Sequence, residues 1–338
     1  MSRRVRRRQR QQPRTLQVFL AVVLVLLTVC VLVKAFFLKA PEQKAAELPA
    51  QPAASDTDDS QQSREEQAAQ EALRSHLERK GGFYTILLSG LDDDNGGSDT
   101  NILVAVDTVN GYVYGVSIPR DSKAIIDGKA RKINYAYNKG GTELLADTVS
   151  EQLGIPVDYT VSVNLKGFTA LVDAIGGVDF DVPINMDYDD PIQNLSIHFK
   201  KGVQHLSGAD ALRVVRFRHN NDGSGYGSED LGRMATQQKF LKAVAKKMLS
   251  AGNILTKIDD YAKIFNQYVD TNLTVGNLAW LGTEVLKMGV DKIDFSTLPN
   301  AWKYPYIYLD PDETLALVNT YLNPYVEDRT AEDLNLPG

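Results

Sequence analysis

The sequence predicts a layered α/β domain in which helices flank a central mixed β-sheet, preceded by one N-terminal transmembrane helix. Three observations lead to this prediction. A long apolar run follows an arginine-rich N-terminus, short β-rich runs begin at Phe83, and amphipathic helical patterns alternate with those runs. A chain of 338 residues is long enough to bury a sizeable core.

The N-terminus has the pattern of a membrane anchor. Residues 1–39 contain seven Arg, two Lys and no acidic residue, and an apolar run extends from about Leu16 to Leu38. Such a run is long enough to cross a bilayer, and the arginines hold the head in the cytoplasm. A cleaved signal peptide is the alternative, although the run is longer than a usual signal core. We expect a cytoplasmic head at residues 1–15, a helix crossing the cell membrane once at residues 16–38, and an extracytoplasmic remainder.

The remainder of the chain is acidic and has no disulfide. Beyond residue 39 it holds 28 basic and 43 acidic residues, a formal charge of −15. Nucleic-acid binders need a clustered basic face, so no nucleic-acid partner is expected, and any bound anion must be neutralised locally. The single cysteine, Cys30, lies in the expected anchor. An exported region without disulfides fits a bacterial envelope.

The segment after the anchor has the composition of a stalk. Residues 40 to about 80 are rich in Ala, Gln, Glu, Asp and Pro and have no aromatic or β-branched apolar residue, so they cannot build a core. Ser63 and Glu66 form a capping-box pattern, which predicts a lone helix in the second half. The predicted organisation beyond the anchor is a stalk at 39–81, one domain at 82–328 and a polar tail at 329–338.

Within the domain, apolar β-rich runs alternate with helical patterns. The runs typical of buried strands lie at 83–90, 101–107, 112–119, 158–164, 178–183 and 292–299. The helical patterns lie at 140–154, 164–177, 234–250, 258–270, 275–289 and 312–325. No linker separates the two halves, so one domain is the simpler interpretation.

Carboxylates gather directly after the first predicted strand. The stretch GLDDDNGGSDT places four aspartates around a Gly-Gly turn: Asp92, Asp93, Asp94 and Asp99. Carboxylates in a tight loop at a sheet edge suit a hard divalent cation, although a solvated acidic loop has the same composition. The next strand end adds Arg120 and Asp121 in SIPRDS. A neighbouring strand would bring these two residues to the same edge.

Basic residues recur at three further places. GKARKINYAY adds Lys132, and VVRFRHNND adds Arg216 and Arg218, whose side chains point the same way only if the backbone there is extended. Arg233 is expected to open a helix, whose N-terminus attracts anions, and Gln237 faces the same way one turn later. Each residue alone could be a surface charge. Together with a cation site, they supply what a pyrophosphate requires.

Other clusters have weaker signals. His198, His205 and His219 lack the spacing of zinc ligands. The stretch DYDDP, residues 187–191, could bind calcium or form a polar loop.

The assembled motifs resemble the LytR-CpsA-Psr family of bacterial envelope enzymes. The matching stretches include LLSGLD, SDTNILVAVD, VSIPRDS, KINYAY, LSGADALRVVRFRH and DLGRMATQQ, in that order, over nearly all of residues 83–250. The basic head, single anchor and external domain also fit the topology of that family. The resemblance therefore identifies the region 82–328 as an LCP-like catalytic domain.

The resemblance implies a phosphotransferase with a lipid-linked donor. Such an enzyme takes a glycopolymer from an undecaprenyl-pyrophosphate carrier at the membrane and joins it to peptidoglycan by a phosphodiester. The family's Mg²⁺-binding aspartates fall on Asp92 and Asp99. Its pyrophosphate-binding residues fall on Arg120, Arg216, Arg218, Arg233 and Gln237, and less securely on Lys132. The Arg-Asp pair continues to Asp121, and the implied catalytic residues are Arg120, Asp121 and Arg218.

This sequence departs from the family pattern near the metal site. Family members often have an arginine directly before the SDT motif, where this chain has Gly97 and then Ser98, and another arginine where it has Asp94. A lipid tail would need an oily groove, which the helix bearing Phe168, Leu171, Val172 and Ile175 could line unless those side chains fill the core.

Two other functions fit parts of the sequence. A pyrophosphatase would use the same charges with water as the acceptor. A non-enzymatic, membrane-tethered envelope regulator would need neither the metal site nor the arginine cluster.

Overall fold

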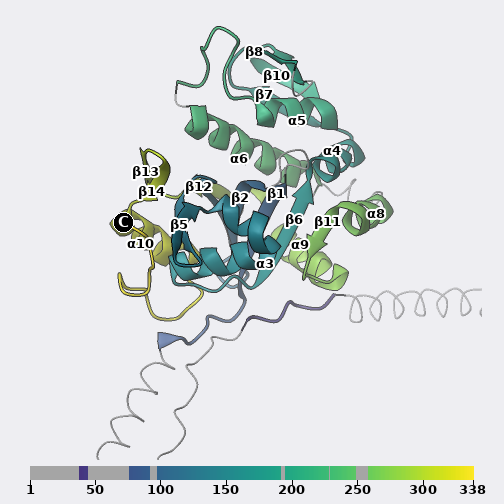
Figure 1. Cartoon of the computed structure of the whole chain (residues 1–338). Coiled ribbons are helices and arrows are strands. Elements are labelled where there is room, and N and C mark those ends of the chain that lie inside the picture. The colour runs from purple at the N-terminus through teal and green to yellow at the C-terminus, as the bar shows by residue number, and fades with distance from the viewer. Residues whose placement is uncertain (1–37, 45–75, 92–96, 192–194, 228, 249–257) are drawn as a thin grey trace, which may run out of the picture.

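The computed structural model describes residues 38–44, 76–91, 97–191, 195–227, 229–248 and 258–338 (Figure 1). Almost all of the expected transmembrane helix lies outside these residues. Among the residues that are described, no helix is long and apolar enough to span a bilayer. The anchor therefore stays a prediction.

A six-stranded sheet forms the centre of the domain. Its strands, in spatial order, are β11 (Val269–Thr271), β6 (Tyr159–Asn164), β1 (Phe83–Leu91), β2 (Ser98–Asp107), β3 (Tyr112–Ile118) and β12 (Ile293–Thr297). β2 is antiparallel to both β1 and β3, whereas β6 runs parallel to β1 and β12 parallel to β3. The sheet is mixed, as predicted. The carboxyl ends of β1, β3, β6 and β12 lie together with the start of β2, along the edge of the sheet that is formed by the strand ends.

Helices cover both faces of this sheet. On one face, Leu87 and Leu103 are fully buried beneath α3 (Asn134–Leu153). On the other face, Ile102 and Val104 pack with side chains of α6 (Glu229–Met248) and α9 (Val275–Met288). Successive residues of β2 thus point to opposite faces, and both faces are apolar, as expected of a buried strand.

A second group of elements has its own core above the central sheet (Figure 1). It contains α4 (Leu165–Ala174), β7 (Val178–Val182), β8 (Met186–Asp190), β9 (Leu195–Phe199), β10 (Gly202–Leu206) and α5 (Gly208–Arg216). Val172 and Ile175 are buried in this core, and Phe168 and Leu171 pack against it. The side chains expected to line an oily groove therefore fill a core instead.

The remaining elements connect these layers or lie at their margins. They are β4 (Lys123–Ile126), β5 (Lys129–Lys132), α8 (Ile258–Tyr268), a 3₁₀ turn (Val290–Lys292), β13 (Asn300–Lys303), β14 (Tyr306–Leu309), α10 (Pro311–Leu317) and a π-helical turn (Val318–Leu322). The sequence did not predict the three hairpins β4–β5, β8–β9 and β13–β14. Their strands are short, and most of their residues are exposed or half-buried.

Both ends of the expected stalk pack on the domain. The Asn277 amide donates a hydrogen bond to the carbonyl of Lys39 (2.9 Å), and the Gln43 amide donates to the carbonyl of Lys80 (2.7 Å). Arg79 forms an ion pair with the fully buried carboxylate of Asp158 (2.8 Å). The folded unit therefore includes residues 38–44 and 76–81, which the sequence analysis assigned to the anchor's end and the stalk.

The C-terminal segment is also part of the fold. The Arg329 side chain is almost fully buried, its guanidinium lies 4.2 Å from the ring centre of Tyr325, and it donates to the carbonyl of His76. The His76 ring contacts Asp333 (2.9 Å) and Glu327 (3.2 Å). Residues 329–338, expected to form a polar tail, thus hold the N-terminal segment of the domain.

Replacing Asp158 by alanine should strongly destabilise the domain. Its carboxylate accepts hydrogen bonds from Arg79, from Thr85 and from the backbone of Lys44. Removing one partner leaves a buried charge uncompensated, which costs about 3–5 kcal/mol. Urea denaturation of the full chain in detergent measures the loss. The exposed Asp181 provides the control, because Asp181→Ala should change the free energy of unfolding by less than about 0.5 kcal/mol.

His76 should stabilise the domain in a pH-dependent way. The hydrogen bond to Asp333 raises the pKa of His76 above its usual 6.5. Its contribution is therefore complete below about pH 6.5 and is lost as the pH rises through the higher pKa of the folded state. His76→Gln should lower the urea midpoint more at about pH 5.5 than at about pH 8.5. An equal loss at both values would contradict a charged His76.

Candidate active site

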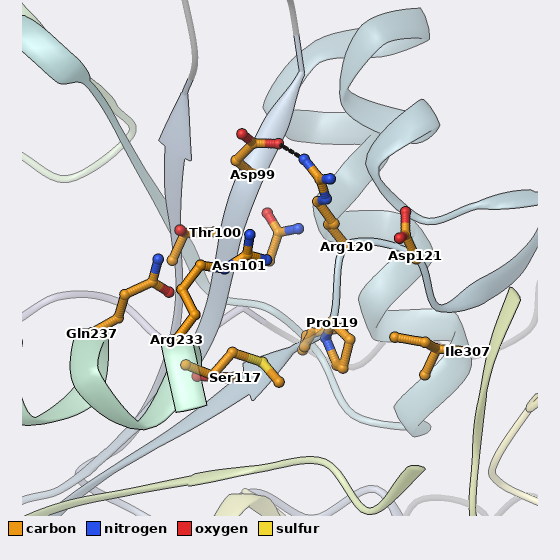
Figure 2. Close-up of a pocket in the computed structure, with 12 residues that line it drawn as sticks. Asp99, Thr100, Asn101, Ser117, Pro119, Arg120, Asp121, Arg233, Gln237 and Ile307 are labelled. Atoms are coloured by element: carbon orange, nitrogen blue, oxygen red, sulfur yellow. Dashed lines mark hydrogen bonds and ion pairs between the residues drawn. The ribbon is translucent and has the colours of Figure 1, made fainter. Parts of the chain in front are cut away.

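Asp99 and Arg120 meet at the edge where the strand ends converge. Asp99 is the second residue of β2, and Arg120 follows the end of β3, where Asn101 pairs with Ile118. The Arg120 guanidinium lies 2.6 Å from an Asp99 carboxylate oxygen (Figure 2). Open α/β sheets bind ligands outside the carboxyl ends of their strands, which is where this pair lies.

A pocket surrounds this ion pair. It is lined by Asp99, Thr100, Asn101, Ser117, Ile118, Pro119, Arg120, Asp121, Arg233, Met234, Gln237 and Ile307. Five residues of the expected site therefore line one cavity, three from the sheet edge and two from α6 (Figure 2). Among the described residues, four of the charged side chains expected at the site line this cavity: Asp99, Arg120, Asp121 and Arg233. It offers an anion two guanidiniums within a wall that also carries carboxylates.

Asp121 is paired with Lys132. Their charged atoms are 3.0 Å apart, and the Asp121 side chain is mostly buried. Lys132 ends β5, so the β4–β5 hairpin delivers this cation to the pocket wall. The carbonyl of Asp121 accepts a hydrogen bond from the Ile307 N–H (2.9 Å), which fixes the backbone beside Arg120.

Arg216 and Arg218 do not line the pocket. Arg216 is the last residue of α5, and the buried Phe217 that follows has extended backbone angles. The extended backbone that the sequence analysis required for their side chains to point together is therefore absent at Arg216. The end of α5 still lies beside the pocket, because the Gln237 amide donates to the carbonyl of Val215 (3.0 Å).

Arg233 does not open its helix. α6 begins at Glu229, so Arg233 lies in the second turn and the unpaired N–H groups of the helix start lie one turn before it. The side chain nevertheless lines the pocket. The helix is held in place by Gln238, whose amide donates to the Ser117 hydroxyl (2.9 Å) and the Ser296 carbonyl (2.7 Å).

The expected metal site is only partly described. Asp92 lies outside the described residues, as do Asp93 and Asp94. The Asp99 carboxylate is partly exposed at the pocket, and such oxygen ligands suit Mg²⁺.

Gly97 stands directly before the SDT motif, where the sequence analysis noted the absence of an arginine. Its φ angle is +115°, and a Cβ atom there would lie 2.9 Å from the side-chain oxygen of Asn138. A glycine therefore suits this backbone, and an arginine would be strained.

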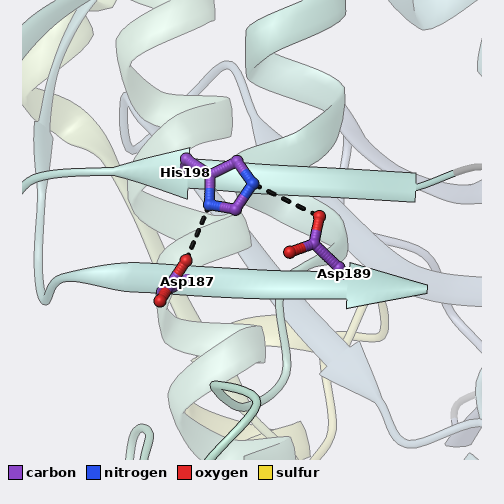
Figure 3. A group of neighbouring side chains, drawn as sticks. All are labelled: Asp187, Asp189 and His198. Carbon is purple, nitrogen blue, oxygen red and sulfur yellow. Dashed lines mark hydrogen bonds and ion pairs between the residues drawn. The ribbon is translucent and has the colours of Figure 1, made fainter. Parts of the chain in front are cut away.

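A second cluster lies on the β8–β9 hairpin (Figure 3). Asp187 and Asp189 share one face with His198, whose ring nitrogens lie 2.7 Å and 3.2 Å from their carboxylates. The hydrogen bond to Asp187 raises the pKa of His198. All three residues are exposed. The stretch DYDDP thus forms a surface strand whose carboxylates are paired with a histidine.

Sequence reasoning missed several residues of the pocket, notably Asn101, Ser117 and Ile307. Asn101 had a visible signal, because it is a polar residue in the apolar run NILVAVD. Ile307 gave no such signal, since it reaches the pocket from a hairpin that the sequence did not predict.

Comparison with known proteins identifies the family of this chain. A sequence model of the LytR_cpsA_psr family matches residues 49–322. The chain belongs to this family. The relatives include the polyisoprenyl-teichoic acid–peptidoglycan teichoic acid transferases TagV of Bacillus subtilis and TagU of Bacillus cereus, each 37% identical. The matches cover 57% and 56% of this chain, and 50% and 60% of those relatives.

A solved structure also resembles this LytR_cpsA_psr member. The crystal structure of B. subtilis TagV matches with a TM-score of 0.60 and 32% identity, over 71% of this chain and 96% of that one. The chain thus spans about half to three-fifths of the curated relatives in sequence, and nearly all of the solved TagV chain in structure.

Introducing the family's arginine at position 97 should destabilise this member. Gly97→Arg forces a side chain into the left-handed region, which costs about 1–3 kcal/mol. Thermal or urea unfolding measures the loss. Gly81→Ala is the matched control, because Gly81 has no neighbour within 4 Å and no left-handed backbone. Equal stability of the Gly97→Arg variant and the wild type would show that position 97 accepts an ordinary residue.

Proposed function

We propose that this chain is a membrane-anchored phosphotransferase that moves a glycopolymer from an undecaprenyl-pyrophosphate carrier to peptidoglycan, forming a phosphodiester. Family membership and the activity named for TagV and TagU support this function. The observation that carries the proposal is the pocket where Asp99, Arg120, Asp121 and Arg233 converge. Two arginines of an acidic protein meet two carboxylates there, at the edge of the sheet suited to ligands.

The arginines would receive the negative charge of the pyrophosphate. Arg120, after the end of β3, and Arg233, from α6, line one cavity, so a phosphoryl group bound there would be contacted by both guanidinium groups. Charge-assisted hydrogen bonds from guanidinium groups stabilise the charge that develops on the leaving phosphate. Gln237 would add an uncharged amide from α6, and Arg216 and Arg218, at the end of α5 beside the pocket, would extend the cationic surface outside it.

Asp99, together with Asp92, would hold Mg²⁺, which polarises phosphoryl oxygens when bound. Asp121 is the carboxylate placed to accept the proton of the attacking hydroxyl, since it lines the pocket and is not the proposed metal ligand. Its ion pair with Lys132 keeps the carboxylate oriented toward the hairpin side of the cavity.

The anchor would place this chemistry in the cell membrane. With the head cytoplasmic and the domain extracytoplasmic, the enzyme is confined to the surface that holds its lipid-linked donor. Confinement to one surface raises the effective concentration of the two partners.

Arg120→Ala should abolish polymer transfer while leaving the fold intact. Loss of one charged donor to a reacting phosphate lowers turnover about 10²–10³-fold. The ion pair with Asp99 is partly exposed, so its loss should cost less than about 1 kcal/mol of stability. The assay combines the full chain in detergent with Mg²⁺, a lipid-linked donor and peptidoglycan fragments, and detects the conjugate by mass spectrometry.

Arg213→Ala is the control, because Arg213 is an exposed α5 arginine paired with Asp210 on its own helix. It should retain full transfer. Two outcomes would overturn the proposal. The wild type could release free polymer phosphate without any conjugate, which would identify a pyrophosphatase, or Arg120→Ala could transfer polymer at the normal rate.

A further inference from the structure

Asn101 is a buried amide without a partner. The side chain is 1% exposed, and neither its nitrogen nor its oxygen has a hydrogen-bond partner in the described structure. Leaving a buried polar group unsatisfied costs about 1–3 kcal/mol per group, and native proteins rarely keep one without a reason. A strand in which the residues from Ile102 to Val106 are all apolar has no structural need for an amide at this position.

Asn101 belongs to a polar row that crosses the sheet. It pairs with Ser89 on β1, and Ser89 pairs with Ser162 on β6. One step further from the edge, on the same face, the corresponding pair is Leu87 and Leu103 in the core. On the face beneath α3, the apolar pair Leu87–Leu103 thus gives way to the polar pair Ser89–Asn101 toward the edge that carries the pocket.

The members of this row differ in their surroundings. Ser162 shares a hydrogen bond with Thr142 of α3 (3.1 Å), so a structural contact accounts for it. Ser89 is buried and has no hydrogen-bond partner among the described residues, but it does not line the pocket. Asn101 does line the pocket, and in Figure 2 its amide lies between Arg120 and Arg233.

The donors and acceptors on each group decide which amide atom would contact a bound phosphate. Phosphate oxygens only accept hydrogen bonds, and guanidinium groups only donate them. An amide between an arginine and a phosphate must therefore turn its oxygen toward the arginine and its NH₂ group toward the phosphate. This adds a donor to a cavity that already holds four charged side chains, without adding another charge.

We propose that Asn101 is a substrate-contacting residue whose Nδ2 donates a hydrogen bond to a phosphoryl oxygen in this pocket, while its Oδ1 accepts from the adjacent guanidinium groups. This inference rests on the proposed function, because it takes the ligand to be a pyrophosphate. It gives a function to Asn101, whose side chain makes no hydrogen bond within the described structure.

Two variants at this position separate a ligand contact from a structural role. Asn101→Leu keeps the approximate shape and removes the unsatisfied polar atoms, so the melting temperature should stay equal or rise. The loss of a hydrogen bond to a charged group should weaken the binding of inorganic pyrophosphate with Mg²⁺ about 10-fold or more. Asn101→Asp keeps the shape but turns the donor into a negative acceptor, and should weaken binding further.

The measurement is titration calorimetry of full-length protein in detergent with inorganic pyrophosphate and Mg²⁺, alongside thermal unfolding. Ser89→Ala is the matched control, because it removes the neighbouring unpartnered hydroxyl and should leave binding unchanged. Arg120→Ala is the reference for the pocket itself. A lower melting temperature for Asn101→Leu together with normal binding by Asn101→Asp would establish a structural amide and overturn the inference.

The failure of this inference is distinct from failure of the proposed function. If Arg120→Ala abolishes pyrophosphate binding while both Asn101 variants bind normally, only the role of Asn101 is refuted. If the wild type itself binds no pyrophosphate, the proposed function fails and the inference fails with it.

Discussion

The site depends on the register of β2 between its two antiparallel neighbours. Backbone hydrogen bonds place Asn101 opposite both Ser89 and Ile118, and this pairing brings Asp99 beside Arg120. The β1–β2 pairing is interrupted between Gly90 and Leu91, where Asp99 is an extra residue of β2. Beyond it the side chains alternate, so Asn101 and Ile102 point to opposite faces and Ile102 packs beneath α6 and α9. An arginine and a carboxylate that are 21 positions apart in sequence become neighbours through backbone geometry alone.

α6 is the element that joins the two halves of the domain. Phe240 is fully buried in the core of the second group of elements, which contains α4, α5 and β7–β10, and the next residue, Leu241, packs on the central sheet. Two neighbouring apolar stripes of α6 therefore contact the two cores. Arg233 and Gln237 therefore project from a support that is fixed against both cores, while Gln238 adds hydrogen bonds to β3 and β12. The pocket wall opposite Arg120 is thus built on a rigid part of the fold.

Much of this arrangement was predictable because it depends on periodic patterns. The buried strands and the long helices came from runs of apolar residues, and the convergence of Asp99 with Arg120 came from their positions at strand ends. The three hairpins were missed because their strands are short and partly exposed, which leaves little apolar signal. The Ser207 cap fixes the start of α5 and does not mark its end at Arg216, and the burial of Asn101 depends on tertiary packing. Neither is visible in the spacing of charges.

The turn between β2 and β3 lies at the opposite end of the strands from the pocket. Its tip residue Val109 is 74% exposed, so extra residues there would enter solvent without moving either strand. An extra residue within β2 would instead turn Asp99 to the other side of the sheet. Length variation among related chains should therefore collect around Val109, and the spacing from Asp99 to Asp107 should stay constant even where the amino acids themselves differ.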